Sequence, residues 1–140
     1  MKFEDYIKRK IVKRTTRDRQ LIKSIIKAVE SDLKFFEKSE ITEESSRKIV
    51  SNYYDILREL LEAMANNDNY KIYSHEAFAQ YLEEIKKEAN IAHKFDRFRK
   101  IRNNINYYGA RVSVEEAKEY KKEILSILTI LKEKYLRGEK

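Results

Sequence analysis

Apolar residues recur every three or four positions along most of this chain. That spacing is typical of helices that bury one face and expose the other. It predicts five helical segments. They cover residues 3–38 with a break near 15–18, a stretch from Thr42 to the Asn-rich loop 66–69, a stretch that begins at Ser74, residues 94–108, and a stretch from Ser113 through Tyr135.

Residues at the ends of these segments support the same division. Thr42 and Ser74 are good N-caps, because their hydroxyl groups can accept hydrogen bonds from the first backbone amides. Ser113 and Glu116 have the spacing of a capping box. Gly109 stands where a left-handed residue is expected after a helix. Five amphipathic segments with short connections predict an antiparallel up-and-down helical bundle of about five helices.

The composition favours the same all-α fold. The 140 residues include no proline and only two glycines, so the main helix breakers and the usual hairpin turns are scarce. Lys, Glu, Arg, Leu and Ala, which favour helices, dominate the chain. The length fits one domain, and neither a linker nor an internal repeat divides it, so residues 1–140 are predicted to form a single domain.

Several classes of protein are excluded by what the chain lacks. Without cysteine, neither disulfides nor thiolate metal sites can form. The basic N-terminus has no apolar core of the kind found in secretory signals. No apolar run approaches the roughly 18 residues that a membrane-spanning helix needs. We therefore expect a cytoplasmic protein that does not associate with membranes.

The net charge of +7 is concentrated in two blocks. Residues 1–20 hold eight basic and three acidic side chains, and residues 93–111 hold six basic and one acidic. A basic block attracts phosphate groups, but Lys-rich solvated faces are common on soluble bundles. Charge alone therefore favours a solvated surface over a binding site.

The segment 94–108 carries an unusual polar stripe opposite its apolar face. Helical spacing places Arg99, Arg102, Asn103 and Asn106 on adjoining strips of one side. Asn disfavours helix interiors, because its amide competes with the backbone for hydrogen bonds. Arg and Asn together offer planar, directional groups suited to phosphates and nucleobases. Binding is one interpretation of the stripe; ion pairs, backbone bridging or a dimer contact are the others.

The histidines and tyrosines give weaker evidence for a functional site than the polar stripe does. His75 and His93 stand next to helix starts without the spacing of metal ligands, so we expect solvated or capping roles and no metal or cofactor. The ten tyrosines supply apolar area with a polar tip, which suits cores and base stacking alike. Tyr53 and Tyr108 continue apolar stripes, so we expect them in the core. Tyr54, Tyr73 and Tyr107 lie outside these stripes and are freer to take another role.

Residues 98–109, FRKIRNNINYYG, resemble the signature helix of HEPN-domain proteins, particularly the small prokaryotic ones. The stretches 73–77 and 113–117, which open helices, and the five-helix layout are similar too. The resemblance implies a helical bundle that dimerises, with the polar helix lining a cleft at the two-fold axis. Active HEPN members are metal-independent ribonucleases that use an Arg followed a few residues later by a His.

This chain matches only the first half of that catalytic pattern. Arg102 and Asn103 fit, but the family's His would fall near Asn106 or Tyr107, and neither is His. Asn cannot transfer protons near neutral pH. We therefore expect a non-catalytic HEPN protein whose Arg99, Arg102, Asn103 and Asn106 bind RNA or a nucleotide. The alternatives are a divergent ribonuclease toxin assisted by Tyr107 or a displaced His, and a purely structural interaction module.

The resemblance also implies partners. Small HEPN proteins are often paired with a minimal nucleotidyltransferase in toxin–antitoxin or related two-component systems. In some of them, a Tyr just after the motif accepts nucleotidyl groups. Tyr107 and Tyr108 are the candidates for that acceptor here. We expect a homodimer with a cognate nucleotidyltransferase and an RNA or nucleotide ligand.

Overall fold

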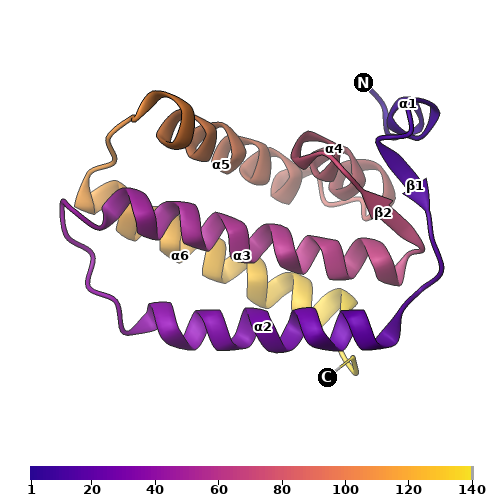
Figure 1. The fold of residues 1–140 in the computed structure, drawn as a ribbon, viewed down its shortest axis with the longest axis horizontal. Helices are drawn as coiled ribbons and strands as arrows, with labels where there is room; N and C mark the ends of the chain where they lie inside the picture. Colours follow the sequence, from indigo (N-terminus) through magenta and orange to yellow (C-terminus); the bar gives the residue numbers. More distant parts are fainter. Residues whose placement is uncertain (140) are drawn as a thin grey trace.

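The computed structural model describes residues 1–139, and its body is a bundle of four long helices. They are α2 (Arg19–Glu37), α3 (Ser46–Asn67), α5 (Ala89–Tyr108) and α6 (Val114–Tyr135). Successive long helices run in opposite directions (Figure 1). The predicted all-α, antiparallel up-and-down bundle is therefore confirmed.

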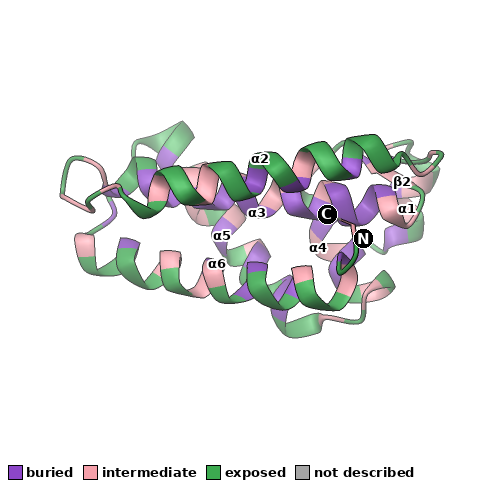
Figure 2. Cartoon of the chain, turned by 90° about the horizontal axis from the view of Figure 1, so that it is seen from below, coloured by how far each residue is buried: buried purple, intermediate pink, exposed green. Residues whose placement is uncertain are grey.

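Helix α3 is the centre of the bundle. It packs against α2, α5 and α6, and 13 of its 22 residues are buried. By contrast, only three of the 19 residues of α2 are buried, and its outward face is solvent-exposed (Figure 2). Residues on two sides of α3 therefore face the core, and the side toward α5 positions the candidate site.

The N-terminal segment departs from the prediction of one helix over residues 3–38. A short helix, α1 (Phe3–Lys8), ends before Lys10, whose φ of 61° is left-handed. Strand β1 (Val12–Arg14) then pairs antiparallel with β2 (Tyr70–Ile72), with Val12 opposite Ile72. Both of these side chains are buried, so the ribbon seals one end of the bundle (Figure 1). The expected break near 15–18 lies between β1 and α2.

Two short elements connect β2 to α5. Helix α4 (His75–Gln80) continues into a single π-helical turn, η1 (Tyr81–Ile85). Tyr81 is fully buried there, and its hydroxyl donates to Asp68 Oδ2 at 2.6 Å. The Asn-rich loop is also tied to the core, because Asn66 Oδ1 accepts from the Asp18 backbone amide at 2.8 Å. The first bond holds η1 at the end of α3, and the second joins that end to the start of α2.

The helix ends confirm some predictions and correct others. Gly109 has the expected left-handed conformation, with a φ of 62°, and Ser113 and Glu116 form the capping box. Helix α3 begins at Ser46, and Thr42 caps the turn that leads into it, because its Oγ1 accepts from the Ser45 backbone amide at 3.2 Å. Helix α5 begins at Ala89 instead of residue 94, so His93 lies inside the helix. None of the helices described is long and apolar enough to cross a membrane.

Candidate functional site

The predicted polar stripe of α5 lies along one side of that helix. Phe95, Phe98 and Ile105 are buried, as their apolar spacing predicts. Tyr108 does not continue this stripe: its side chain is 82% exposed, because it occupies the last turn of α5, beyond the packed part of the helix. The polar residues differ in exposure. Arg99, Arg102 and Asn103 are half-buried, and Asn106 is exposed.

Arg102 is held against α3. Its guanidinium lies over the ring of Tyr54, with Cζ 5.6 Å from the ring centroid. Nη2 is 3.4 Å from Asp55 Oδ1, which is longer than the 2.7–2.9 Å typical of a charge-assisted hydrogen bond. The buried Nε finds no hydrogen-bond partner among residues 1–139. Arg102 is thus positioned by packing while part of its donor capacity stays unused.

A histidine from another helix lies beside the same tyrosine. The Tyr54 hydroxyl and His75 Nδ1 are 3.0 Å apart, and their rings are 5.8 Å apart between centroids. We call the group on α3, α4 and α5 the Arg102 cluster. Its members are Tyr54, Asp55, Arg58, His75, Arg99 and Arg102.

Two sequence interpretations are corrected by this cluster. Tyr54 is fully buried instead of free, and it stacks on Phe95 with centroids 5.4 Å apart. Leu57 and Leu61, three and seven positions later, mark a second buried side of α3 that includes Tyr54, and this spacing could have revealed it. His75 is half-buried and bonded to a side chain, not a solvated or capping residue.

The cluster holds three guanidinium groups and one carboxylate, but Arg58 and Arg99 also pair with Glu62 and Asp96, so Arg102 carries its least compensated positive charge. Burial lowers the pKa of the His75 imidazole, and the charges of Arg58 and Arg102 lower it further, against the opposing effect of Asp55. Burial also raises the pKa of the Tyr54 hydroxyl, although the nearby arginines oppose that shift. At neutral pH, therefore, His75 is an uncharged imidazole and Tyr54 a neutral hydroxyl.

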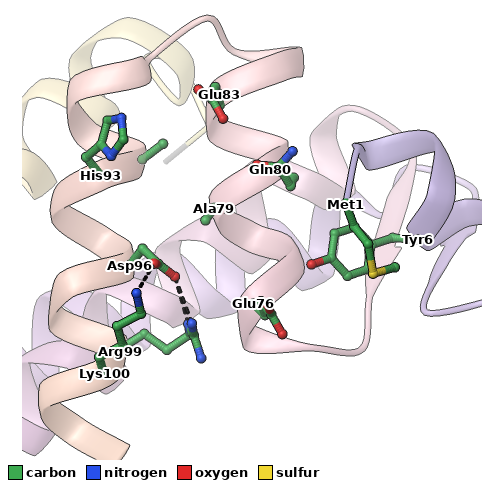
Figure 3. A pocket seen from close by; sticks show the side chains of 11 residues that line it. Met1, Tyr6, Glu76, Ala79, Gln80, Glu83, His93, Asp96, Arg99 and Lys100 are labelled. Atoms are coloured by element: carbon green, nitrogen blue, oxygen red, sulfur yellow. Dashed lines mark hydrogen bonds and ion pairs between the residues drawn. The ribbon is translucent and has the colours of Figure 1, made fainter.

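Arg99 is more fully paired than Arg102. Its Nε and Nη2 contact Asp96 Oδ1 at 3.0 and 2.9 Å, and Lys100 approaches Oδ2 at 3.3 Å. Burial of Asp96 raises its pKa, but these two cations outweigh burial and leave the pKa lowered. Both contacts are visible in Figure 3. The ion-pair interpretation of the stripe therefore holds for Arg99.

A pocket of about 290 Å³ opens beside Arg99, between the N-terminal segment, α4 and α5 (Figure 3). Tyr6 closes one side, and Glu76, Asp96 and Lys100 contribute charges of both signs. The mixture gives this pocket no clear preference for an anion. Anion binding is better placed at Arg102, on the side of α5 that faces Tyr54 and Asp55.

The remaining predicted residues lie toward the C-terminal end of α5. Asn103 follows Arg102 directly, and Asn106 is one turn further along the same side. The side chains of Tyr107 and Tyr108 are 73% and 82% exposed, so both hydroxyls are accessible to another protein. The structure thus groups Arg99 and Arg102 with His75, and leaves the two asparagines and two tyrosines at the edge of that group.

The geometry suits recognition of a phosphate. A guanidinium with unused donors can bind two phosphate oxygens, and a neutral imidazole can exchange a proton with a nearby hydroxyl. Within residues 1–139, no three His, Asp or Glu side chains are grouped so as to hold a metal ion.

We compared the chain with known proteins. No protein-family model, curated protein or solved structure matches this chain.

Proposed function

We propose that this chain is a HEPN-like component of a nucleotidyltransferase-associated system, and that it binds RNA or a nucleotide through a phosphate held at Arg102. Arg99, Asn103 and Asn106 extend the binding surface along α5. In the proposed homodimer, two such surfaces face each other across a two-fold axis.

The observation that carries this proposal is the state of the Arg102 guanidinium. It is fixed over Tyr54 and lies 3.4 Å from Asp55, yet its Nε has no hydrogen-bond partner among residues 1–139. The buried Nε is closed to solvent, but 22% of the Arg102 side chain is exposed, so the Nη donors that the long Asp55 contact leaves largely unused remain open to a ligand. A phosphate oxygen is such a ligand; Arg58 and Arg99 lie nearby, although Glu62 and Asp96 pair with them.

The test is binding of a labelled single-stranded RNA by the purified wild type, Arg102→Ala and Arg97→Ala. Arg97 is the matched control, because it lies on the same helix and pairs with Glu123 on α6, away from the cluster. We expect saturable, salt-sensitive binding that Arg102→Ala weakens about tenfold or more, since a charged hydrogen bond contributes on the order of 1.5–3 kcal/mol. Equal affinities of the two variants would overturn the proposal.

A second candidate, a metal-independent ribonuclease, is favoured by the position of His75. In the tautomer whose Nδ1–H donates to the Tyr54 hydroxyl oxygen, the other nitrogen of the neutral ring can accept a proton from a ribose 2′-hydroxyl. That oxygen would then attack the adjacent phosphorus, giving a 2′,3′-cyclic phosphate while the 5′-oxygen leaves and takes up a proton. His75 would replace the His that α5 lacks.

Cleavage assays separate these candidates. In EDTA, a ribonuclease would cleave labelled RNA, and both His75→Gln and Arg102→Ala would abolish turnover. A binding component would show no cleavage, and His75→Gln would retain RNA affinity within a few-fold. A purely structural module would neither bind nor cleave RNA, and Arg102→Ala would weaken self-association instead.

The proposed partner is tested at the end of α5. If Tyr107 or Tyr108 accepts a nucleotidyl group, incubation with a cognate nucleotidyltransferase and ATP adds the mass of one AMP to the peptide that contains them. The Tyr107→Phe/Tyr108→Phe double variant should then remain unmodified. An unmodified wild-type peptide would count against the acceptor role while leaving RNA binding untouched.

A further inference from the structure

The β1–β2 ribbon carries an exposed aromatic ring with two cations close to it. Tyr73 follows β2 directly, and 61% of its side chain is exposed. Lys13 Nζ on β1 and Lys71 Nζ on β2 lie 5.4 and 5.7 Å from its ring centroid. The Tyr73 backbone amide donates to the Ile11 carbonyl at 2.8 Å, so the backbone at Tyr73 is held in place by the ribbon.

The two lysines occupy an unusual position for like charges. Lys13 and Lys71 are direct partners in the register of the ribbon, which places them on the same face. Like charges opposite each other destabilise a strand pair. Glu62 compensates one of them through a 2.9 Å ion pair with Lys71, whereas Lys13 is exposed on the ribbon. The face therefore keeps a positive potential next to an accessible ring.

This face adjoins the Arg102 cluster. Tyr73 and His75 are separated only by Ser74, whose φ of −129° and ψ of 133° are extended. In extended chain, residues two apart project to the same side, with their Cα atoms roughly 7 Å apart. His75 is bonded to Tyr54, over which Arg102 lies. The ring of Tyr73 thus continues the surface that begins at the Arg102 guanidinium.

We propose that Tyr73, flanked by Lys13 and Lys71, is a base-stacking subsite for single-stranded RNA whose neighbouring phosphate is held at Arg102. The subsite rests on the proposed RNA-binding function and extends it. An exposed ring stacks on any base face, and the adjacent cations engage the phosphates on either side. Bases inside a duplex do not present a face to such a ring, so the occupant is an unpaired strand.

The test compares a labelled single-stranded RNA with an abasic strand of the same length. Tyr73→Ala should weaken binding of the base-containing strand about tenfold and leave the abasic strand unchanged, because stacking contributes on the order of 1–3 kcal/mol per base. Tyr73→Phe should retain the wild-type affinity. Phe35→Ala, which removes a 69% exposed aromatic from α2, is the matched control and should have no effect.

A fluorescence readout keeps the test independent of small losses of stability. The chain has no tryptophan, so Tyr73→Trp introduces a single reporter, with Phe35→Trp as its control. RNA should quench the first and not the second. If the wild type binds neither strand, both the proposed RNA-binding function and the proposed stacking subsite are wrong. If it binds RNA but Tyr73→Ala has no effect, or if duplex RNA binds equally well, only the stacking subsite falls.

Discussion

Tyr54 and His75 are joined by a 3.0 Å hydrogen bond between residues of different helices, and Arg102 lies over the same tyrosine ring. The hydroxyl holds the imidazole close enough to Arg102 for the guanidinium charge to lower the pKa of His75. The pKa of His75 therefore reports on the charge of the whole cluster.

The first prediction concerns that reporter. Arg102 is one of the three positive charges that lower the pKa of His75, with Arg58 and Arg99, after the larger effect of burial. Arg102→Ala should therefore raise the pKa of His75, and a phosphate bound at Arg102 should raise it too. NMR titration suits the measurement, because the chain has only two histidines. A His75 pKa that moves in neither case would contradict the proximity of the charges.

A second prediction tests the tyrosine. Tyr54→Phe keeps the buried ring but removes the partner of His75 Nδ1, so the free energy of unfolding should fall by about 1 kcal/mol. Tyr54→Ala should cost roughly 3–5 kcal/mol, because it also leaves a cavity. Denaturant unfolding measures both. Tyr53→Phe is the control, since this neighbour is equally buried but lies on the side of α3 that faces Phe36.

A third prediction concerns stability at mildly acidic pH. The native pKa of His75 lies below its usual value of 6.5, so the unfolded chain binds the proton first as the pH falls. Stability should therefore decline as the pH drops below about 6.5, until the native His75 protonates as well. Melting temperatures at about pH 7.5 and pH 5 should differ less in His75→Gln than in the wild type. An equal difference in both proteins would exclude His75 as the cause.

A fourth prediction concerns the ion pair beside the pocket. Arg99 and Lys100 lower the pKa of Asp96, so the stabilisation from this carboxylate is present above its usual value of 3.8 and is lost as the pH falls through the native pKa. Asp96→Asn should thus be less stable than the wild type at neutral pH, by about 1 kcal/mol or less for such an accessible pair. In urea unfolding, the difference between the two proteins should shrink as the pH falls below 3.8 and through the native pKa. A difference that does not shrink would indicate packing instead of charge.

A fifth prediction concerns the end of α5. Gly109 is left-handed, with a φ of 62°, although a Cβ at this position would meet no atom within 4 Å. Gly109→Ala should therefore cost about 1 kcal/mol through backbone conformation alone, and Gly109→Asn should cost less. Thermal unfolding of the three proteins gives the order. An alanine variant as stable as the wild type would contradict the assigned cap.

The sequence was sufficient to predict the elements that depend on local periodicity and on helix caps. The three- and four-residue spacing predicts the long helices, and Gly109, Ser113 and Glu116 act within one turn of their positions. The ribbon escaped prediction because each strand has three residues, and Val12 meets Ile72 only through the tertiary fold. The same holds for the candidate site. Arg102 stands out in the sequence, whereas His75 joins it only because α4 packs against α3.

The pairing of Val12 with Ile72 also has a kinetic consequence. It closes a loop that contains all of α2 and α3, and the entropy of that closure is offset only once those helices have packed. We therefore expect α1 and β1 to dock late in folding, and to open at a lower free energy than the four-helix body. Such an opening would carry Tyr6 and Lys13 away while Tyr54, His75 and Arg102 stay assembled. The N-terminal segment is thus an adjustable rim around a rigid centre.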